Sequence, residues 1–583
     1  MFWERYALWS QDPYFDEASR QELLALQDIR EIEDRFYTDL EFGTGGLRGI
    51  LGAGTNRMNK YVVRKVTQGL AELIADEGEE AMRRGVVIAH DSRRFSAEFA
   101  REAALVLARN GVLAYLFADL RPTPELSFAV RYLGAKAGIV VTASHNPKEY
   151  NGYKVYWEDG GQVPPEQADK ILAKIRARET WTGIEPMAEE EARQRGLLVS
   201  IGEDVDRVYY DRVKSLALHQ ELIRATGGTL KVVYSPLHGA GNHGVRRILE
   251  DLGFSQVHVV AEQELPDPNF STVAVPNPEN PSAFDLARRL GEQVGADLLL
   301  ATDPDADRLG VVAKDRQGNL IQLTGNQVGV LLTYYILTEK RKQGILPPDA
   351  VVIKTIASSD LADALVPALG ARVENVLTGF KFIAEKEKEL EELGSGKFQF
   401  GFEESYGYLA GDFVRDKDAV IAALLVCEAA LYYKQREGIT LLDVLQRIHD
   451  AAGYYMEEQV SLTFTGKEGK ARIAALMDGL RQRDLTAVGG IGVARVDDYD
   501  ARVGKDSEGA SYALTLPRSN VLRFSLAGGG FVLARPSGTE PKIKFYFSVK
   551  GQDQAAASQR LLGVKEDFMH VVDTILQDFV TEV

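Results

Sequence analysis

Short apolar runs rich in β-branched residues alternate with helix-period segments along most of the chain. Such alternation predicts layered α/β domains whose strands are largely parallel. The predicted strands form three clusters, separated by helix-period segments such as 97–110 and 283–295. The clusters comprise residues 85–89, 112–117 and 137–142, then 230–234, 256–260 and 296–301, then 350–354, 373–376 and 397–400.

In each cluster one apolar strand runs directly into a polar loop. The strand ending at Thr142 continues as Ala-Ser-His-Asn, the strand ending at Ala301 continues as Thr-Asp-Pro-Asp, and the strand ending at Phe400 continues as Gly-Phe-Glu-Glu. Ligands of open α/β sheets gather at the carboxyl ends of the strands. The recurrence therefore predicts three domains that face one cleft.

The two ends of the chain have a different pattern. The first forty residues are acidic and helix-like, and residues 189–196 are predicted to form a surface helix. From about Tyr454 onward the predicted strands are antiparallel in character, at 521–525, 530–534 and 543–548, and a closing helix follows. We expect this region to form a separate α+β domain.

Composition and charge limit the classes of function that the protein can have. The 583 residues are 45% hydrophobic and carry a formal net charge of −17, which argues against a nucleic acid partner because phosphate backbones demand a basic surface. The single cysteine, Cys427, lies in an apolar run and is expected to be a buried small hydrophobe. The N-terminus lacks a secretory pattern and no run of about 20 apolar residues occurs, so we expect a cytoplasmic protein without a membrane partner.

The segment Thr142-Ala-Ser-His-Asn-Pro147 offers a candidate nucleophile. Pro147 and the later Asn151-Gly152 are turn signals, so Ser144 is expected on an ordered loop. A pairing of Ser144 with His145 as its base is not evident, because neighbouring side chains in an extended segment point apart.

A phosphorylated serine that donates its phosphoryl group differs from a serine nucleophile activated by a base. It needs cations and a metal around its phosphate more than it needs a base. Lys148 and Lys154 supply positive charge nearby. The alternative for Ser144 is a purely structural role as a helix cap.

Three aspartates occupy alternate positions in Thr302-Asp-Pro-Asp-Ala-Asp-Arg308. Carboxylates at i, i+2 and i+4 on an extended loop can converge on one cation, and hard oxygen ligands favour Mg²⁺ or Ca²⁺. An EF-hand begins with the same spacing but needs Gly at its sixth position and Glu at its twelfth. Those positions are Arg308 and Lys314 here, so the calcium-loop hypothesis fails.

Two further loops carry weaker signals. In Gly401-Phe-Glu-Glu-Ser-Tyr-Gly407, a carboxylate and a hydroxyl could bind adjacent sugar hydroxyls, although surface acid pairs are common. In Arg535-Pro-Ser-Gly-Thr-Glu-Pro541, backbone N–H groups, hydroxyls and an arginine could bind phosphate oxygens, and an ordinary hairpin loop is the alternative.

Two loops near the N-terminus are also suggestive. Gly43-Thr-Gly-Gly-Leu-Arg-Gly49 brings Arg48 into a glycine-rich turn, without the Lys-Ser/Thr ending of a P-loop. His90-Asp-Ser-Arg-Arg94 puts Asp91 and Arg93 at the end of a strand.

Together these motifs resemble the α-D-phosphohexomutase family (phosphoglucomutase/phosphomannomutase) over nearly the whole chain. The most specific parts are 142–147, 303–308 and 535–541. The stretches 40–46, 54–58 and 411–418 resemble the branch of bacterial α-phosphoglucomutases that is close to animal phosphopentomutase and glucose-1,6-bisphosphate synthase.

The resemblance implies an α/β protein with four domains around a central cleft. Three similar three-layer α/β domains, at 1–205, 206–318 and 319–452, would carry the phosphoserine loop, the metal loop and the sugar-recognition loop. A C-terminal α+β domain at 453–583 would bind phosphate. We expect a monomer or a homodimer.

The resemblance also implies roles for individual residues. Ser144 would be the phosphoserine, and Asp303, Asp305 and Asp307 would hold Mg²⁺ together with a phosphate oxygen on Ser144. The transferring group would be surrounded by Arg48, Lys154 and Arg308, with Lys154 a candidate general acid/base and His145 placed beside them. Substrate would be bound by Glu403, Ser405, Lys381, Arg535, Ser537, Gly538 and Thr539.

Two departures from the family pattern concern the sugar. Tyr406 follows the sugar-loop serine where the family often has Gly. Phe380 precedes Lys381 where many members have His or Trp, so the acid/base role of that His has no assigned residue here.

These roles imply a phosphoglucomutase that interconverts glucose-1-phosphate and glucose-6-phosphate through glucose-1,6-bisphosphate. Alternatives within the class are a phosphopentomutase, a phosphomannomutase, a sugar-bisphosphate synthase and a Mg²⁺-dependent phosphatase. A non-catalytic sugar-phosphate sensor is disfavoured because a sensor does not need a phosphoryl carrier.

Overall fold

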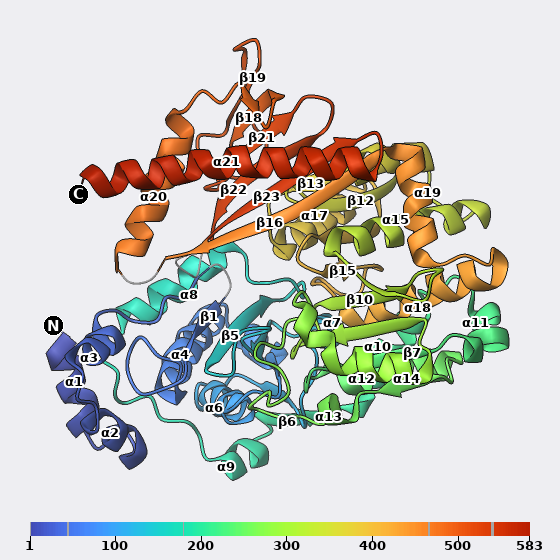
Figure 1. Ribbon diagram of the computed structural model, residues 1–583. Helices are drawn as coiled ribbons and strands as arrows, with labels where there is room; N and C mark the ends of the chain where they lie inside the picture. Colours follow the sequence, from blue (N-terminus) through green and yellow to red (C-terminus); the bar gives the residue numbers. More distant parts are fainter. Residues whose placement is uncertain (1, 44–45, 179, 465–466, 538–541, 583) are drawn as a thin grey trace. The chain divides into compact units, whose positions relative to one another are not determined.

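Figure 1 shows the computed structural model, which describes residues 2–43, 46–178, 180–464, 467–537 and 542–582. The chain forms two compact units. The first contains residues 1–325 and 405–440, and the second contains residues 326–404 and 441–583. Within the described ranges, no helix is both long and apolar enough to cross a membrane.

The predicted N-terminal helices are present as α1 (Phe2–Gln11), α2 (Glu17–Leu24) and α3 (Ile29–Phe36). They attach to the first α/β domain through aromatic side chains. The Trp9 ring stacks on Phe15 at 4.3 Å between centroids and meets Tyr61 edge-on at 5.5 Å. These residues are almost fully buried, so the N-terminal helices belong to the core of the first unit.

The first sheet has the strand order β1-β5-β4-β2-β3-β6. Its parallel part is β4-β2-β3-β6, and β1 and β5 are antiparallel to their neighbours. The three strands predicted in this region are confirmed as β2, β3 and β4. The bounds are β1 (Gly46–Ile50), β2 (Val86–His90), β3 (Ala114–Phe117), β4 (Ala137–Val141), β5 (Tyr150–Trp157) and β6 (Leu198–Ile201).

The prediction of a turn at Asn151-Gly152 is wrong, because both residues lie inside β5. A Cβ on Gly152 would lie 2.5 Å from the Thr142 carbonyl oxygen and 2.8 Å from that of Leu47. Glycine at this position lets β1, β5 and the end of β4 approach one another closely. It is a packing requirement that local turn signals cannot distinguish.

Seven helices of the described chain follow α3 within this domain and its connection to the next. The amide groups that open α4 are capped by Asn59, whose Oδ1 accepts from the N–H groups of Tyr61 and Val62. The bounds are α4 (Lys60–Asp76), α5 (Glu79–Arg84), α6 (Ser96–Arg109), α7 (Thr123–Tyr132), α8 (Pro165–Ala177), α9 (Glu189–Gln194) and α10 (Glu203–Lys214).

The second sheet of the first unit has the order β11-β10-β9-β7-β8. Its parallel part, β9-β7-β8, confirms the second predicted cluster, and β10 and β11 add antiparallel strands. The bounds are β7 (Val232–Ser235), β8 (Val257–Val259), β9 (Leu298–Thr302), β10 (Leu309–Lys314) and β11 (Leu320–Leu323), with α11 (Gln220–Thr226), η1 (Gly227–Thr229), α12 (Gly241–Leu252), α13 (Ala261–Glu264), η2 (Pro281–Phe284) and α14 (Asp285–Val294).

The segment 405–440 completes the first unit with β15 (Gly407–Leu409) and the buried helix α18 (Ala419–Arg436). Cys427 lies in this helix and is fully buried, as expected. Asp418 caps α18, since its carboxylate accepts from the N–H groups of Val420 and Ile421.

In the second unit, the parallel strands β13-β12-β14 confirm the third predicted cluster. Their bounds and those of the neighbouring helices are β12 (Ala350–Thr355), β13 (Arg372–Val376), β14 (Lys397–Glu403), α15 (Gly325–Lys342), α16 (Leu361–Leu365), η3 (Pro367–Leu369), α17 (Phe380–Leu393) and α19 (Leu441–Ala452).

The C-terminal region folds as the predicted antiparallel sheet with a closing helix. The sheet order is β16-β23-β22-β21-β18-β19-β20, with β17 paired to β18, and the long helix α21 lies along the sheet (Figure 1). The bounds are β16 (Tyr454–Thr463), β17 (Ala487–Val488), β18 (Ile491–Asp498), β19 (Val503–Asp506), β20 (Ser511–Ala513), β21 (Leu522–Leu526), β22 (Gly530–Pro536), β23 (Lys542–Gly551), α20 (Lys467–Gln482) and α21 (Gln554–Glu582).

The close approach at Gly152 predicts a specific sensitivity. Gly152→Ala should lower the free energy of unfolding of the first unit by about 2 kcal/mol or more, because the added methyl group overlaps two carbonyl oxygens. Gly161→Ala, just beyond the same strand, meets only ordinary contacts of 3.4 Å or more and should change it by less than about 0.5 kcal/mol. Urea unfolding of both variants measures this, and equal effects would contradict it.

The buried cap of α18 predicts a pH dependence. Burial raises the pKa of Asp418 from its ordinary value of 3.8 to about 6, although the two backbone N–H groups and the Tyr209 hydroxyl favour the carboxylate. Between about pH 4 and 6 the native state therefore binds more protons than the unfolded chain, and rising pH lowers the contribution of this group to stability.

Asp418→Asn keeps the cap but cannot ionise. Its free energy of unfolding relative to the wild type should increase by about 2 kcal/mol between pH 4.5 and 7.5, because ~1.4 kcal/mol accompanies each pH unit of difference. Urea unfolding at both pH values tests this. A difference that does not change with pH would contradict it.

Candidate functional site

Ser144 lies in the loop that follows β4, with only 3% of its surface exposed. Its Oγ donates to Asp303 Oδ2 at 2.8 Å and lies 3.2 Å from His145 Nδ1. The expectation that Ser144 and His145 point apart is therefore wrong. Ser144 has a φ of +50° and is not extended, so the two neighbouring side chains converge.

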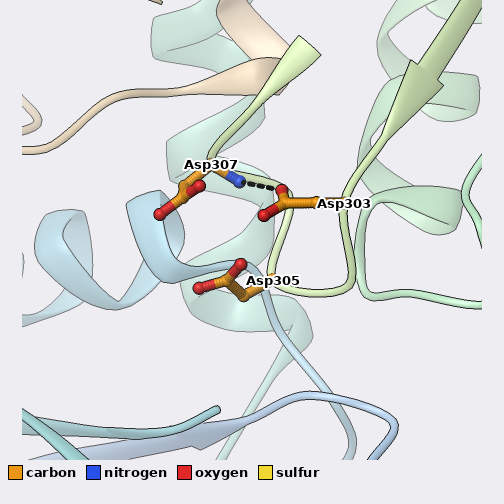
Figure 2. Close-up of side chains that lie close together, drawn as sticks. All are labelled: Asp303, Asp305 and Asp307. Carbon is orange, nitrogen blue, oxygen red and sulfur yellow. Dashed lines mark hydrogen bonds between the residues drawn. The ribbon is translucent and has the colours of Figure 1, made fainter. Parts of the chain in front are cut away.

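The three aspartates lie on the loop between β9 and β10, and each is at most 1% exposed. Figure 2 shows their carboxylate groups turned toward one another. One oxygen from each group lies within 4.8 Å of the other two. Asp303 Oδ1 shapes the loop by accepting from the N–H groups of Asp307 at 3.1 Å and Arg308 at 3.0 Å. Ala306, at a φ of +50°, turns the chain between them.

Two lysines balance the charge of this loop. Lys154 Nζ, on β5, lies 2.7 Å from Asp305 Oδ2 and 3.4 Å from Asp307 Oδ2. Lys417 Nζ, just before α18, lies 3.1 Å from Asp307 Oδ2. Lys417 is almost fully buried, and the sequence argument gave it no role although it lies within the stretch 411–418 that resembles the family.

The pKa values of Asp303 and Asp305 are shifted in opposite directions. Burial, followed by the charges of Asp307 and Asp305, raises the pKa of Asp303 well above its ordinary value. Burial acts in the same direction on Asp305, but Lys154, a hydrogen bond with Asp303 and the charge of Lys417 together outweigh it and lower the pKa of Asp305. Burial lowers the pKa of Lys154, but the charges of Asp305 and Asp307 outweigh it and raise that pKa.

The donor set fits a hard divalent cation. Asp305 Oδ1 and Asp307 Oδ1 are buried and have no hydrogen-bond partner in the described part of the chain, although Arg308 Nε lies 3.9 Å from Asp307 Oδ1. Buried carboxylate oxygens without donors are costly unless a cation binds them. Oxygen-only ligands favour Mg²⁺ over zinc or copper.

Arg48 and Arg308 belong to the same unit as Ser144. Arg48 extends from β1, and its Nη1 donates to Asn146 Oδ1 at 3.0 Å, two residues beyond Ser144. Arg308 directly precedes β10, and its guanidinium binds the Glu279 carboxylate. The structure therefore brings the predicted catalytic residues of the first unit together around two loops, the one that contains Ser144 and the one that contains the three aspartates.

Thr123 is a residue of this site that sequence reasoning missed. It opens α7 and is fully buried. Its Oγ1 donates to Asp305 Oδ2 at 2.9 Å, and its N–H donates to the Asp305 carbonyl at the same distance. A Thr-Pro pair at a helix start gives no local sign of a contact nearly two hundred residues away.

Ser405 also lies in the first unit, directly before Tyr406. Tyr406 has a φ of +64°, a conformation that glycine adopts freely and other residues rarely do. Its carbonyl accepts from the Leu309 N–H at 3.1 Å, which ties this loop to the strand after the aspartates. The departure from the family pattern at Tyr406 thus keeps a glycine-like backbone.

The remaining predicted substrate residues lie in the second unit. Glu403 ends β14 and is 5% exposed, and Ser537 follows β22. Gly538 and Thr539 lie outside the described residues.

Cations gather near the end of β22. Arg535 lies directly opposite Lys544 in the sheet, so both side chains project from the same face. Burial lowers the pKa of Lys381, in the first turn of α17, and the charge of Arg535 acts in the same direction. Positive side chains assembled in this way favour binding of an anion such as phosphate.

Comparison with known proteins gives these sites a context. The sequence matches the four domains described as phosphoglucomutase/phosphomannomutase, namely α/β/α domain I (39–181), domain II (207–318), domain III (324–449) and the C-terminal domain (485–561). The chain belongs to this family. The Ser144 loop lies in domain I, the aspartate loop in domain II and Glu403 in domain III.

Curated relatives extend the similarity over most of the chain. It is 38% identical to a phosphoglucomutase of Staphylococcus haemolyticus, over 90% of this chain and 93% of that protein. It is 37% identical to a phosphoglucomutase of Staphylococcus aureus strain MRSA252, over 91% and 94%.

Solved structures show the same fold. The exocytosis-sensitive phosphoprotein pp63/parafusin (phosphoglucomutase) of Paramecium, in its open form, is similar with a TM-score of 0.66 and 17% identity, over 93% of this chain and 96% of that one. A phosphoglucomutase/phosphomannomutase family protein of Burkholderia thailandensis has a TM-score of 0.63 and 20% identity, over 92% and 97%.

The contact from Thr123 to Asp305 predicts an effect on metal affinity. Thr123→Val removes the hydroxyl that orients the carboxylate. If the aspartates hold a divalent cation, titration with Mg²⁺ should show an apparent affinity weakened by about 10-fold, as is usual for groups that hold metal ligands. Activity at saturating Mg²⁺ should fall much less. Thr123→Ser keeps the hydroxyl and should bind Mg²⁺ like the wild type, so an equal loss in both variants would contradict the role of this contact.

Proposed function

We propose that this enzyme is a phosphoglucomutase that interconverts α-glucose-1-phosphate and glucose-6-phosphate through a phosphorylated Ser144 and glucose-1,6-bisphosphate. The observation that carries the proposal is the contact of 2.8 Å between Ser144 Oγ and Asp303 in a loop of three buried carboxylates. The relatives at 37–38% identity that bear this name support it.

Mg²⁺ is the proposed metal, held by Asp303, Asp305 and Asp307 together with a phosphate oxygen on Ser144. When bound, it would neutralise negative charge on the phosphoryl group and so make the phosphorus easier to attack. The unpartnered oxygens of Asp305 and Asp307 support this assignment.

The chain's own cations would act on the transferring phosphoryl group. Arg48 and Arg308 are proposed to stabilise charge on its equatorial oxygens. Lys154 is our candidate for the general acid/base, and its raised pKa, which keeps it charged at neutral pH, supports the acid role. His145, beside Ser144 Oγ, is proposed to hydrogen-bond the seryl oxygen as the phosphate leaves.

In the first half-reaction the Ser144 Oγ–P bond would break and a bond would form between phosphorus and a sugar hydroxyl oxygen, whose proton passes to the base. The resulting bisphosphate must turn end for end so that its other phosphate faces Ser144. In the second half-reaction the bond between that phosphorus and its sugar oxygen would break, the phosphoryl group would return to Ser144 Oγ, and the sugar oxygen would take up a proton from the acid. Glu403 and Ser405 are proposed to bind the sugar hydroxyls in either orientation. Lys381, Arg535, Ser537, Gly538 and Thr539 are proposed to bind the phosphate that does not react.

The proposal places the enzyme among small sugar phosphates in the cytoplasm. Phosphopentomutase and phosphomannomutase activities remain the alternatives within the class, because Tyr406 and Phe380 depart from the family pattern near the proposed sugar site. Comparing ribose-1-phosphate and mannose-1-phosphate with glucose-1-phosphate as substrates separates them.

The phosphoryl carrier gives the most direct test of function. Ser144→Ala should lower kcat for glucose-1-phosphate by at least about 1,000-fold, because the variant has no oxygen to carry the phosphoryl group. The assay contains Mg²⁺ and a trace of glucose-1,6-bisphosphate and measures glucose-6-phosphate. Ser92→Ala, at a neighbouring strand end, removes a hydroxyl without a hydrogen-bond partner in the described chain and should retain activity.

Two outcomes would contradict the proposal. An active Ser144→Ala variant would exclude the carrier role. Release of inorganic phosphate by the wild type without an isomerised product would indicate a phosphatase.

A further inference from the structure

A single buried arginine donates hydrogen bonds to the main-chain carbonyls of the loop that contains Ser144. Arg93 follows β2 and is 3% exposed. Its Nη2 donates to the carbonyl oxygens of Ser144 and, at 2.5 Å, of Asn146. Its Nη1 donates to the carbonyl oxygens of Pro147 at 2.9 Å and Tyr150 at 3.2 Å. One guanidinium thus binds four carbonyls in a segment of seven residues.

The partner of Arg93 fixes the other side of the same peptide. Asp91 Oδ2 lies 3.2 Å from Arg93 Nε and accepts from Thr142 Oγ1 at 2.7 Å. Thr142 Oγ1 in turn accepts from the Ser144 N–H at 2.8 Å. The Asp91–Arg93 ion pair therefore holds both main-chain polar groups of Ser144. Asp91 holds the N–H through Thr142, and Arg93 binds the carbonyl directly.

A residue from the second α/β domain covers the arginine. The Phe270 ring lies 4.9 Å from the Arg93 guanidinium carbon, and both residues are at most 3% exposed. The aromatic face attracts the cation and keeps water from the carbonyls that it binds. The network is therefore shielded from water, which favours a fixed geometry.

That geometry is one which serine does not adopt readily. The left-handed φ of +50° at Ser144 costs free energy for a residue with a Cβ, and it persists only where the surroundings determine it. It is also what directs Oγ toward both Asp303 and His145. Holding the N–H and the carbonyl of Ser144 is the direct way to enforce it.

We propose that Arg93 is a positioning residue for phosphoryl transfer, because its guanidinium holds the main chain of Ser144 in the left-handed conformation that aims Oγ at the aspartate loop. The inference rests on the proposed function of Ser144. Arg93 acts through the loop, since its side chain is almost fully buried and both of its Nη atoms are bonded to loop carbonyls.

Lysine cannot substitute for arginine in this role. A guanidinium presents its donors in a flat fork, and here Nη1 and Nη2 reach four carbonyls at once while the charge forms an ion pair with Asp91. An ammonium has three donors around one point and cannot span the same set. Arg93→Lys therefore keeps the charge and removes the geometry.

The test compares Arg93→Lys with Arg94→Lys. Arg94 is the next residue, is exposed and directs its side chain to Asn269 instead of the loop. Arg93→Lys should lower kcat for glucose-1-phosphate by about 30- to 100-fold, the scale of a misplaced reacting group, with KM changed less than about 3-fold. Intact mass should show a parallel slowing of Ser144 phosphorylation by glucose-1,6-bisphosphate. Arg94→Lys should match the wild type in all three measurements.

A second variant keeps the test decisive if Arg93→Lys does not fold. Thr142→Val conserves side-chain shape and removes the hydroxyl that joins Asp91 to the Ser144 N–H. It should give the same signature, with kcat lowered about 10-fold and KM nearly unchanged. A folded Arg93→Lys with kcat within about 3-fold of the wild type, or an equal loss in Arg94→Lys, would overturn the inference.

Failure of the inference is distinguishable from failure of the proposed function. If Ser144→Ala is inactive while Arg93→Lys is normal, only the positioning role falls. If Ser144→Ala is active, the phosphoserine mechanism falls and the positioning role falls with it.

Discussion

The carboxylates of Asp303, Asp305 and Asp307 lie within 4.8 Å of one another on a loop from which water is nearly excluded. Like charges at that separation repel strongly in a site of low dielectric constant. The chain compensates from distant segments, with Lys154 on β5 and Lys417 before α18. The antiparallel strand β5 beside β4, and the return of segment 405–440 to the first unit, both serve this requirement.

Backbone strain occurs at each of the loops that this charge cluster joins. Ser144, Ala306 and Tyr406 each have a positive φ, and each lies on a loop that sequence and family assign to function. Strained residues persist where hydrogen bonds from the surroundings exceed the cost. At Ser144 the Asp91–Arg93 pair supplies those bonds, and at Tyr406 the N–H of Leu309 contributes one.

The sequence predicted the strands well, because a fully buried parallel strand is an apolar run with clear ends. It also predicted where the polar loops follow those strands, and hence the positions of Ser144 and the aspartates. It failed at Asn151-Gly152, because a glycine required by three packed strands has the same local signature as a turn. The antiparallel strands β1, β5, β10 and β11 were not predicted either. Their residues alternate with the candidate site loops, so the local pattern was assigned to loops.

The contacts of the site were less predictable than its residues. His145 reaches Ser144 only because the backbone at Ser144 is left-handed, and that conformation depends on partners fifty residues earlier. Thr123 meets Asp305 across two domains, with no local sign in the sequence. Such contacts follow from the tertiary fold. A sequence motif indicates that fold only through its resemblance to a known family.

The most direct measurement of the central claim is transfer of a labelled phosphoryl group through the enzyme. Wild-type protein incubated with Mg²⁺ and glucose-1,6-bisphosphate carrying ³²P should acquire one labelled phosphoryl group on the peptide that contains Ser144. Addition of unlabelled glucose-1-phosphate should move that label to glucose-1,6-bisphosphate. Label on another peptide, or label that leaves only as inorganic phosphate, would contradict the account.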